Sequence, residues 1–141
     1  MRTLAKLTAG VVVLLALAGC SNDPKSAMSA LEAPPGTADT FGGDADALGI
    51  AADSVRLLGE ENGYAFYIAA PDNPENGNVC LVIETLEADT ASAGCHNIPS
   101  VTPLELAVSG VRAKLVVDDY DAGKELSEGW RQLHQNLLVR L

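Results

Sequence analysis

The sequence predicts a small, mainly β domain made of antiparallel hairpins with one or two short helices; a mixed α+β domain is the alternative. Several short runs alternate between apolar and polar residues, which is the pattern of half-buried strands. Asn-Gly and Ser-Gly pairs separate some of these runs, as expected of hairpin turns. The length of 141 residues allows one domain with a modest core.

The first predicted hairpin joins residues 54–59 to residues 64–70 through Glu60-Glu61-Asn62-Gly63. Asn-Gly favours the tight turn whose twist matches that of the flanking strands. Residues 64–70 are apolar or aromatic on both faces, which indicates a central strand.

A third strand is predicted over residues 79–85, after a polar loop at 71–78. Strand geometry places alternate residues on opposite faces. One face would carry Val79, Leu81 and Ile83, and the other would carry Cys80 and Val82. Residues 87–103 are expected to be irregular, because Pro99 and Pro103 interrupt them.

A second hairpin is predicted from residues 104–108 and 111–117, joined by Ser109-Gly110. The later strand alternates cleanly, with Arg112 and Lys114 directed outward. Val111, Ala113, Leu115 and Val117 would face the core.

The C-terminal stretch admits two interpretations. We predict a third hairpin from residues 130–133 and 137–141, turning at His134-Gln135-Asn136, because Gly129 interrupts any longer helix. The alternative is a single helix over 124–141, whose leucines and Trp130 fall at helical spacing.

Two short helices are predicted. Residues 44–52 would form two turns with Leu48, Ala51 and Ala52 on one face. Residues 122–128 would form the second helix, with Asp121 as its N-cap and Gly129 as its stop signal.

Charge and composition exclude several function classes. The chain has 9 basic and 19 acidic residues, a net charge of −10. Such a chain repels phosphate backbones, so a nucleic acid is not expected as a partner. Two histidines and three cysteines are too few for a His-rich or multi-Cys metal cluster, and no cofactor motif is present.

The first twenty residues have the organisation of a targeting signal. Arg2 and Lys6 precede an apolar run over residues 7–18 that is too short to span a bilayer. The ending Leu17-Ala18-Gly19-Cys20 resembles the lipobox of bacterial lipoproteins. This resemblance implies removal of residues 1–19 and attachment of a diacylglyceryl group to Cys20. The protein would then be anchored at the extracytoplasmic face of the cell membrane, or at the outer membrane in a Gram-negative host.

The remaining chain divides into a tether and a domain. Residues 20–46 are acidic and rich in Pro and Gly, so we predict a flexible tether, with an ordered arm at residues 27–31 as the alternative. Residues 47–141 form the predicted domain. With Cys20 lipidated, Cys80 and Cys95 remain, and an oxidising compartment favours a disulfide between them.

Catalytic and metal-binding patterns are sparse. A catalytic serine would need His96 or His134 as its base, and both are interpreted as surface histidines. Asp118, Asp119 and Asp121 are candidate calcium ligands, because Ca²⁺ takes oxygen ligands. They lack the order of a calcium loop, so a solvated turn is the favoured interpretation and no metal site is predicted.

A looser resemblance covers most of residues 50–141, through VRLLGE, GYAFYIAA, VCLVIE, AKLVVDDY and NLLV. This pattern is similar to that of small actinobacterial lipoproteins and implies no activity. We therefore predict a binding or interaction module at the cell envelope, with an envelope protein or a small ligand as its partner. A small envelope enzyme or an enzyme inhibitor is the alternative.

Overall fold

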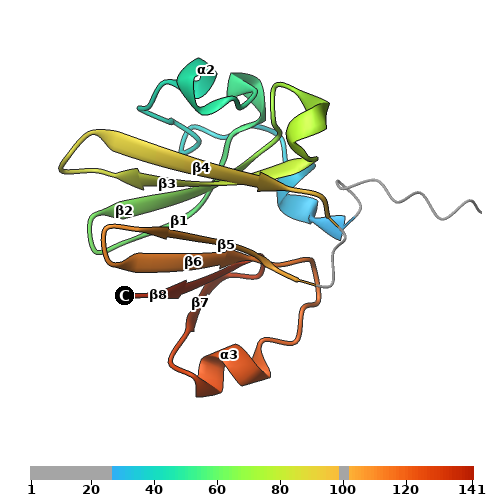
Figure 1. Ribbon diagram of the computed structural model, residues 1–141, viewed down its shortest axis with the longest axis vertical. Coiled ribbons are helices and arrows are strands. Elements are labelled where there is room, and N and C mark those ends of the chain that lie inside the picture. Colours follow the sequence, from blue (N-terminus) through green and yellow to red (C-terminus); the bar gives the residue numbers. More distant parts are fainter. Residues whose placement is uncertain (1–26, 99–101) are drawn as a thin grey trace, which may run out of the picture.

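The computed structural model describes residues 27–98 and 102–141. In this part of the chain, eight strands form two antiparallel four-stranded sheets. Figure 1 shows the sheets stacked face to face, with α2 (Ala45–Leu48) beyond one sheet and α3 (Gly123–Ser127) beyond the other. The predicted mainly β class is confirmed, and its hairpins are divided between two sheets.

The first sheet is a meander in the order β1-β2-β3-β4. Its strands are β1 (Arg56–Glu61), β2 (Tyr64–Ala69), β3 (Val79–Thr85) and β4 (Thr90–His96). The predicted Asn62-Gly63 turn joins β1 to β2, and both residues have positive φ, 49° and 81°, as this type of turn requires. β2 lies between β1 and β3, which confirms it as a central strand.

Strand β4 corrects the sequence prediction of an irregular segment over residues 87–103. Its residues are mainly Ala, Ser, Thr and Gly, so the sequence shows no apolar alternation. Pairing with β3 along the whole length of both strands supplies the order that local propensity does not.

The predicted disulfide between Cys80 and Cys95 is present. The two cysteines are direct register partners on β3 and β4, with their Cα atoms 4.0 Å apart. The bond therefore joins neighbouring strands, and does not attach a strand to an irregular loop as the sequence suggested. It lies on the outer face of the first sheet, packed among apolar side chains of that face.

The second sheet has the order β5-β6-β8-β7. Its strands are β5 (Leu104–Val108), β6 (Val111–Leu115), β7 (Arg131–His134) and β8 (Leu137–Arg140). Both predicted hairpins are confirmed, and the alternative of a single helix over 124–141 is wrong. The pairing of β6 with β8 brings residues 111–115 beside the C-terminal strand.

The main core lies between the sheets. Val79, Leu81 and Ile83 of β3 share one face, as predicted, and the structure shows that this face points inward, where they are fully buried. The opposing face is supplied by β6 and β8, through Val111, Ala113, Leu115, Leu137 and Val139. This burial is the dominant favourable term for a domain of this size.

The sheets also close on each other at both edges. At one edge, Gly94 of β4 lies beneath Leu104 and Leu106 of β5. At the other, a Cβ atom on Gly59 would lie 2.9 Å from the side chain of Leu133, so glycine allows β7 to approach β1. Contact between the edge strands leaves less unpaired backbone exposed than two separate sheets would.

Residues 27–31 correct the prediction of a flexible tether over 20–46 and match the alternative of an ordered arm. Met28 is fully buried in the core between the sheets. The Asp118 backbone N–H donates to the carbonyl of Ala27 (2.9 Å), and the Ser29 backbone N–H donates to the Asp118 carboxylate (3.0 Å). The arm is therefore part of the domain, while residues 20–26 lie outside the described residues.

The following residues also lie along the domain. The Asp39 carboxylate accepts the backbone N–H of Leu57 (2.8 Å), and Phe41 packs edge-on against Tyr67 with ring centroids 5.4 Å apart. Buried Glu84 accepts the hydroxyl of Tyr67 (2.8 Å) and the backbone N–H of Gly42 (3.2 Å). Burial, and then the bond to Glu84, raises the pKa of Tyr67. This segment covers the outer face of the first sheet.

Both helices are shorter than predicted. Asp44 caps α2 by accepting the Ala47 N–H (3.1 Å), and Gly49, with a φ of 68°, ends it after one turn, so a two-turn helix over 44–52 is wrong. A 3₁₀ turn, η2 (Ala52–Ser54), follows. At α3 the N-cap residue is Ala122, and the Asp121 carboxylate instead accepts the N–H of Gly123 (3.0 Å).

Removing the disulfide tests its contribution. The bond closes a loop of 15 residues, for which chain entropy predicts about 3 kcal/mol. We expect C80A/C95A to lower the free energy of unfolding by about this amount while retaining the β-sheet circular dichroism spectrum. Urea unfolding measures the change, with the oxidised natural chain as control. An unchanged unfolding midpoint would contradict the stabilising role.

Truncating Met28 tests the docking of the arm. We expect M28A to destabilise the domain by about 2–5 kcal/mol, because it leaves a cavity between the sheets. M28L conserves volume and should cost less than about 1.5 kcal/mol. The denaturant midpoints of M28A, M28L and the natural chain measure these changes in stability. If M28A is as stable as the natural chain, the arm does not contribute to the core.

Candidate functional site

Charge is distributed unevenly between the two halves of the domain. Residues 27–98 carry twelve acidic side chains and a single basic one, Arg56. Residues 102–141 carry six acidic and five basic side chains. Most cations of the described chain therefore belong to the second sheet and α3, although the protein as a whole is strongly acidic.

Three of these cations surround the only tryptophan of the chain. The Lys114 Nζ atom lies 4.5 Å from the centroid of the Trp130 ring, the Arg140 Cζ atom 5.0 Å, and the Arg112 Cζ atom 5.7 Å. All three distances fall within the range of a cation–π interaction. We call Arg112, Lys114, Trp130 and Arg140 the Trp130 cluster.

Strand geometry places these cations together. Arg112 and Lys114 alternate with core residues of β6 and so lie on the outer face of the second sheet. The β6–β8 register sets Arg140 directly opposite Arg112. Like charges at opposed positions repel, and the ring of Trp130 beside both guanidinium groups offsets part of this cost.

Trp130 is held beneath the cations by the chain leading from α3 to β7. Gly129, with a φ of 89°, ends α3, and the Trp130 backbone N–H donates to the Glu125 carbonyl (3.0 Å). The Trp130 side chain packs with Val116, Ala122 and Leu138 and is 4 % exposed. The surface that the cluster offers to solvent is therefore mainly cationic, with the aromatic ring as its floor.

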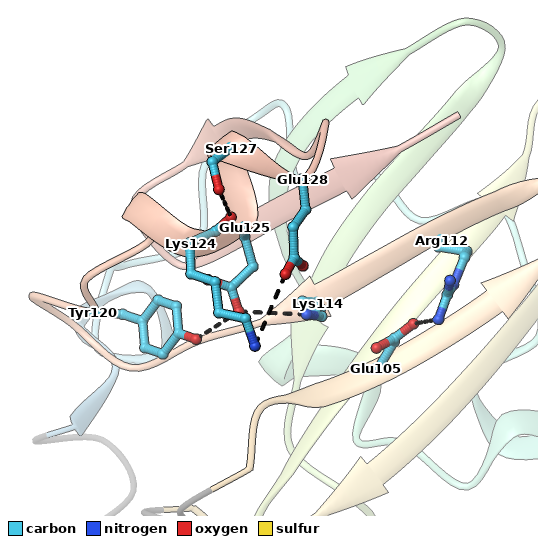
Figure 2. Close-up of polar contacts among 8 residues, drawn as sticks. All are labelled: Glu105, Arg112, Lys114, Tyr120, Lys124, Glu125, Ser127 and Glu128. Atoms are coloured by element: carbon cyan, nitrogen blue, oxygen red, sulfur yellow. Dashed lines mark hydrogen bonds and ion pairs between the residues drawn. The ribbon is translucent and has the colours of Figure 1, made fainter.

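A polar network adjoins the cluster at Lys114, and Figure 2 shows its members Tyr120, Glu125 and Lys114. Buried Glu125 accepts the hydroxyl of Tyr120 (2.8 Å) and pairs with the ammonium of Lys114 (3.4 Å). The hydrogen bond from Tyr120 and the charge of Lys114 hold the pKa of Glu125 below its ordinary value. The same hydrogen bond, and then burial, raises the pKa of Tyr120.

Glu105 on β5 forms an ion pair with Arg112, also drawn in Figure 2. Arg112 and Lys114 each have one carboxylate partner. In the described part of the chain, Arg140 has no carboxylate within ion-pair distance. The cluster with its two partners, Glu105 and Glu125, therefore carries one unneutralised positive charge.

The aspartates proposed as calcium ligands are not brought together as a site. Asp118 holds the arm and also accepts the side-chain amide of Asn136 (2.7 Å). Asp121 is engaged with the backbone of Gly123, and Asp119 is exposed. Over residues 27–98 and 102–141, no group of three or more His, Cys, Asp or Glu side chains is placed to hold a metal ion.

The two histidines belong to different sheets, His96 to β4 and His134 to β7. The Nδ1 atom of half-buried His134 accepts the backbone N–H of Asn136 (3.1 Å), so the neutral ring carries its proton on Nε2. Burial lowers the pKa of His134, and Asp118 partly opposes this shift. His96 is exposed at the end of β4.

A cleft of about 330 Å³ lies at the end of the domain where the arm enters. Arg56 borders it and is held by three backbone carbonyls, those of Ala33, Asp53 and Val55, each at 2.8 Å. The other lining residues are Leu31, Ala51, Asp53, Ser54, Ala70 and Asn78. None of the candidate catalytic, metal-binding or disulfide residues named from the sequence lines this cleft.

Sequence reasoning missed both the Trp130 cluster and the cleft. The alternation of β6 showed Arg112 and Lys114 facing outward, which was the one available signal for the cluster. The nonlocal pairing of β6 with β8, which adds Arg140, leaves no local pattern in the sequence.

Comparison of the chain with protein-family models, with curated proteins and with solved structures finds no match. Among the described residues, no helix is long and apolar enough to cross a bilayer.

Replacing Glu125 tests the network beside Trp130. The pKa of Glu125 lies below 4.5 in the folded chain, so its stabilising effect is complete above that pH and is lost as the pH falls through the folded value. We expect E125Q to be less stable than the natural chain at pH 7 by about 1–3 kcal/mol. The difference between the two chains should shrink in acid.

Urea unfolding of both chains at pH 7 and in acid measures this effect. E128Q is the matched control, because Glu128 pairs with Lys124 at 3.9 Å on an exposed surface and should contribute little. A stability difference between E125Q and the natural chain that does not change with pH would contradict the assigned role of the carboxylate.

Proposed function

We propose that the protein is a lipid-anchored lipoprotein of the extracytoplasmic face of the cell membrane and that its β domain is a binding module. The observation that carries this proposal is the lipobox Leu17-Ala18-Gly19-Cys20, preceded by a cationic and an apolar segment. A diacylated cysteine anchors a domain stably without a membrane-spanning helix. These residues lie outside the part of the chain that the structure describes.

The cysteine arrangement supports an extracytoplasmic location. The Cys80–Cys95 disulfide is of the kind that persists in oxidising compartments and is rare in the reducing cytosol. The disulfide leaves Cys20 as the remaining cysteine of the chain. The thiol of Cys20 is therefore available for the thioether bond, because Cys80 and Cys95 are bonded to each other and do not pair with it.

The binding role is supported by two surfaces. The cleft beside Arg56 has a volume near the lower end of the range for small-ligand sites. The Trp130 cluster presents the guanidinium groups of Arg112 and Arg140 above a buried ring, and Arg is among the residue types that dominate the energetics of protein interfaces. A small ligand or an envelope protein fits these surfaces, whereas the net charge of −10 disfavours nucleic acid.

Substituting Cys20 tests the anchor. We expect C20S, expressed in a bacterium that processes lipoproteins, to lack the acyl mass and to leave the membrane fraction or to retain residues 1–19. Mass spectrometry and fractionation measure both outcomes, and S21A serves as the control that keeps the thiol. A C20S chain that is still processed and still membrane-bound would show that Cys20 is not the anchor.

A further inference from the structure

We infer that the outer face of the second sheet, bearing the Trp130 cluster, together with the adjoining helix α3, rests against a bilayer that contains anionic phospholipid. This inference rests on the proposed lipid anchor at Cys20. It concerns the orientation of the domain, which the anchor alone does not determine.

The anchor leaves little distance between the bilayer and the domain. Because the arm is bound from Ala27 onward, only six residues lie between Cys20 and Ala27, so the path from one to the other is seven residues long. Seven residues span at most about 23–25 Å when fully extended. The domain is therefore confined near the lipid surface, so even weak contacts at a high effective concentration decide which side faces the bilayer.

The charge distribution favours one side. An anionic surface repels residues 27–98, which contain twelve acidic side chains and one basic side chain, Arg56. Residues 102–141 are nearly balanced, and five of the six described cations belong to them. Figure 1 shows α3 on the side of the second sheet away from the first sheet, so this side can face lipid while the acidic part points away.

The Trp130 cluster supplies specific groups for a lipid phosphate. Arg112 and Arg140 are opposed like charges, and Arg140 has no carboxylate partner in the described residues. A guanidinium group binds phosphate oxygens through parallel hydrogen bonds. A phosphate placed between the two arginines would relieve their repulsion, which the ring of Trp130 offsets only in part.

An exposed apolar side chain accompanies these cations. Leu126 lies on α3, the helix that carries Glu125, and is 47 % exposed. It is one of three large apolar side chains that are exposed in the described residues. Cations together with an exposed leucine are a combination that binds the interfacial region of a bilayer.

The single tryptophan provides the measurement. The chain from Cys20 to Leu141, with Cys80 and Cys95 oxidised, is coupled at the Cys20 thiol to a maleimide phospholipid and bound to vesicles. Energy transfer from Trp130 to a dansyl-labelled headgroup reports how close the Trp130 cluster lies to the lipid. We expect more transfer in vesicles that contain phosphatidylglycerol than in pure phosphatidylcholine, and loss of this increase in 1 M salt, where the Debye length is about 3 Å.

Charge variants assign the effect. We expect R112Q/R140Q to lose the increase and R140Q to lose part of it. The single variant still provides a test if the double variant folds poorly. R131Q is the matched control, because Arg131 lies outside the Trp130 cluster and pairs with Glu61 of β1, so this variant should keep the increase. Equal transfer in both vesicle types, or a loss in R131Q equal to that in R140Q, would overturn the inference.

The outcome is independent of cellular lipidation, because the lipid is attached chemically. The mass of the chain isolated from cells tests the proposed anchor, whereas the energy transfer tests the orientation. A lipidated chain whose transfer does not depend on lipid composition refutes only the orientation.

Discussion

The burial of apolar side chains between the two sheets is the interaction on which the rest of the structure depends. Neither four-stranded sheet, with strands of four to seven residues, covers its own apolar face. Phe66 and Leu81 of the first sheet meet Leu115 and Leu137 of the second, and Met28 of the arm completes the layer. In each strand, the residues that alternate with the core residues point to the outer face of the sheet. The sequence of the core strands therefore also determines which side chains the outer faces carry.

The two outer faces are completed in different ways. On the first sheet, the segment around Phe41 and α2 buries apolar groups, and buried Glu84 ties that segment to Tyr67. On the second sheet, Trp130 and α3 cover only part of the face, and the cations of β6 and β8 complete the cover over the ring. The long stems of Lys and Arg pack against apolar surface while their charges stay near water. The first covering is strongly acidic, whereas the second gathers most of the described cations, so the domain has two electrostatically distinct sides.

Local features were predictable from the sequence, and nonlocal ones were not. The turns at Asn62-Gly63 and Ser109-Gly110 and the inward face of β3 follow from rules that act within a few residues. Strand β4 was missed because its small residues owe their order to pairing and to the space they leave for β5. The docking of Met28 was missed because Met28, Leu31 and Phe41 are the few large apolar side chains in residues 20–46, which are otherwise acidic and rich in Pro and Gly. The Trp130 cluster needs the β6–β8 register, which no sequence pattern encodes.

The acidic residues show why carboxylate clusters are poor guides to chemistry in so acidic a chain. Asp118 binds the arm, Asp121 binds the start of α3, and Glu84 and Glu125 accept tyrosine hydroxyls. Each carboxylate satisfies a donor that would otherwise be unpaired within the fold. Cations are scarce by comparison, and gathering three of them over Trp130 places like charges side by side at an energetic cost. A cluster of scarce cations that costs energy to assemble indicates a functional surface more strongly than a cluster of abundant carboxylates does. The outer face of the second sheet, which bears the Trp130 cluster, is therefore the stronger candidate for recognition.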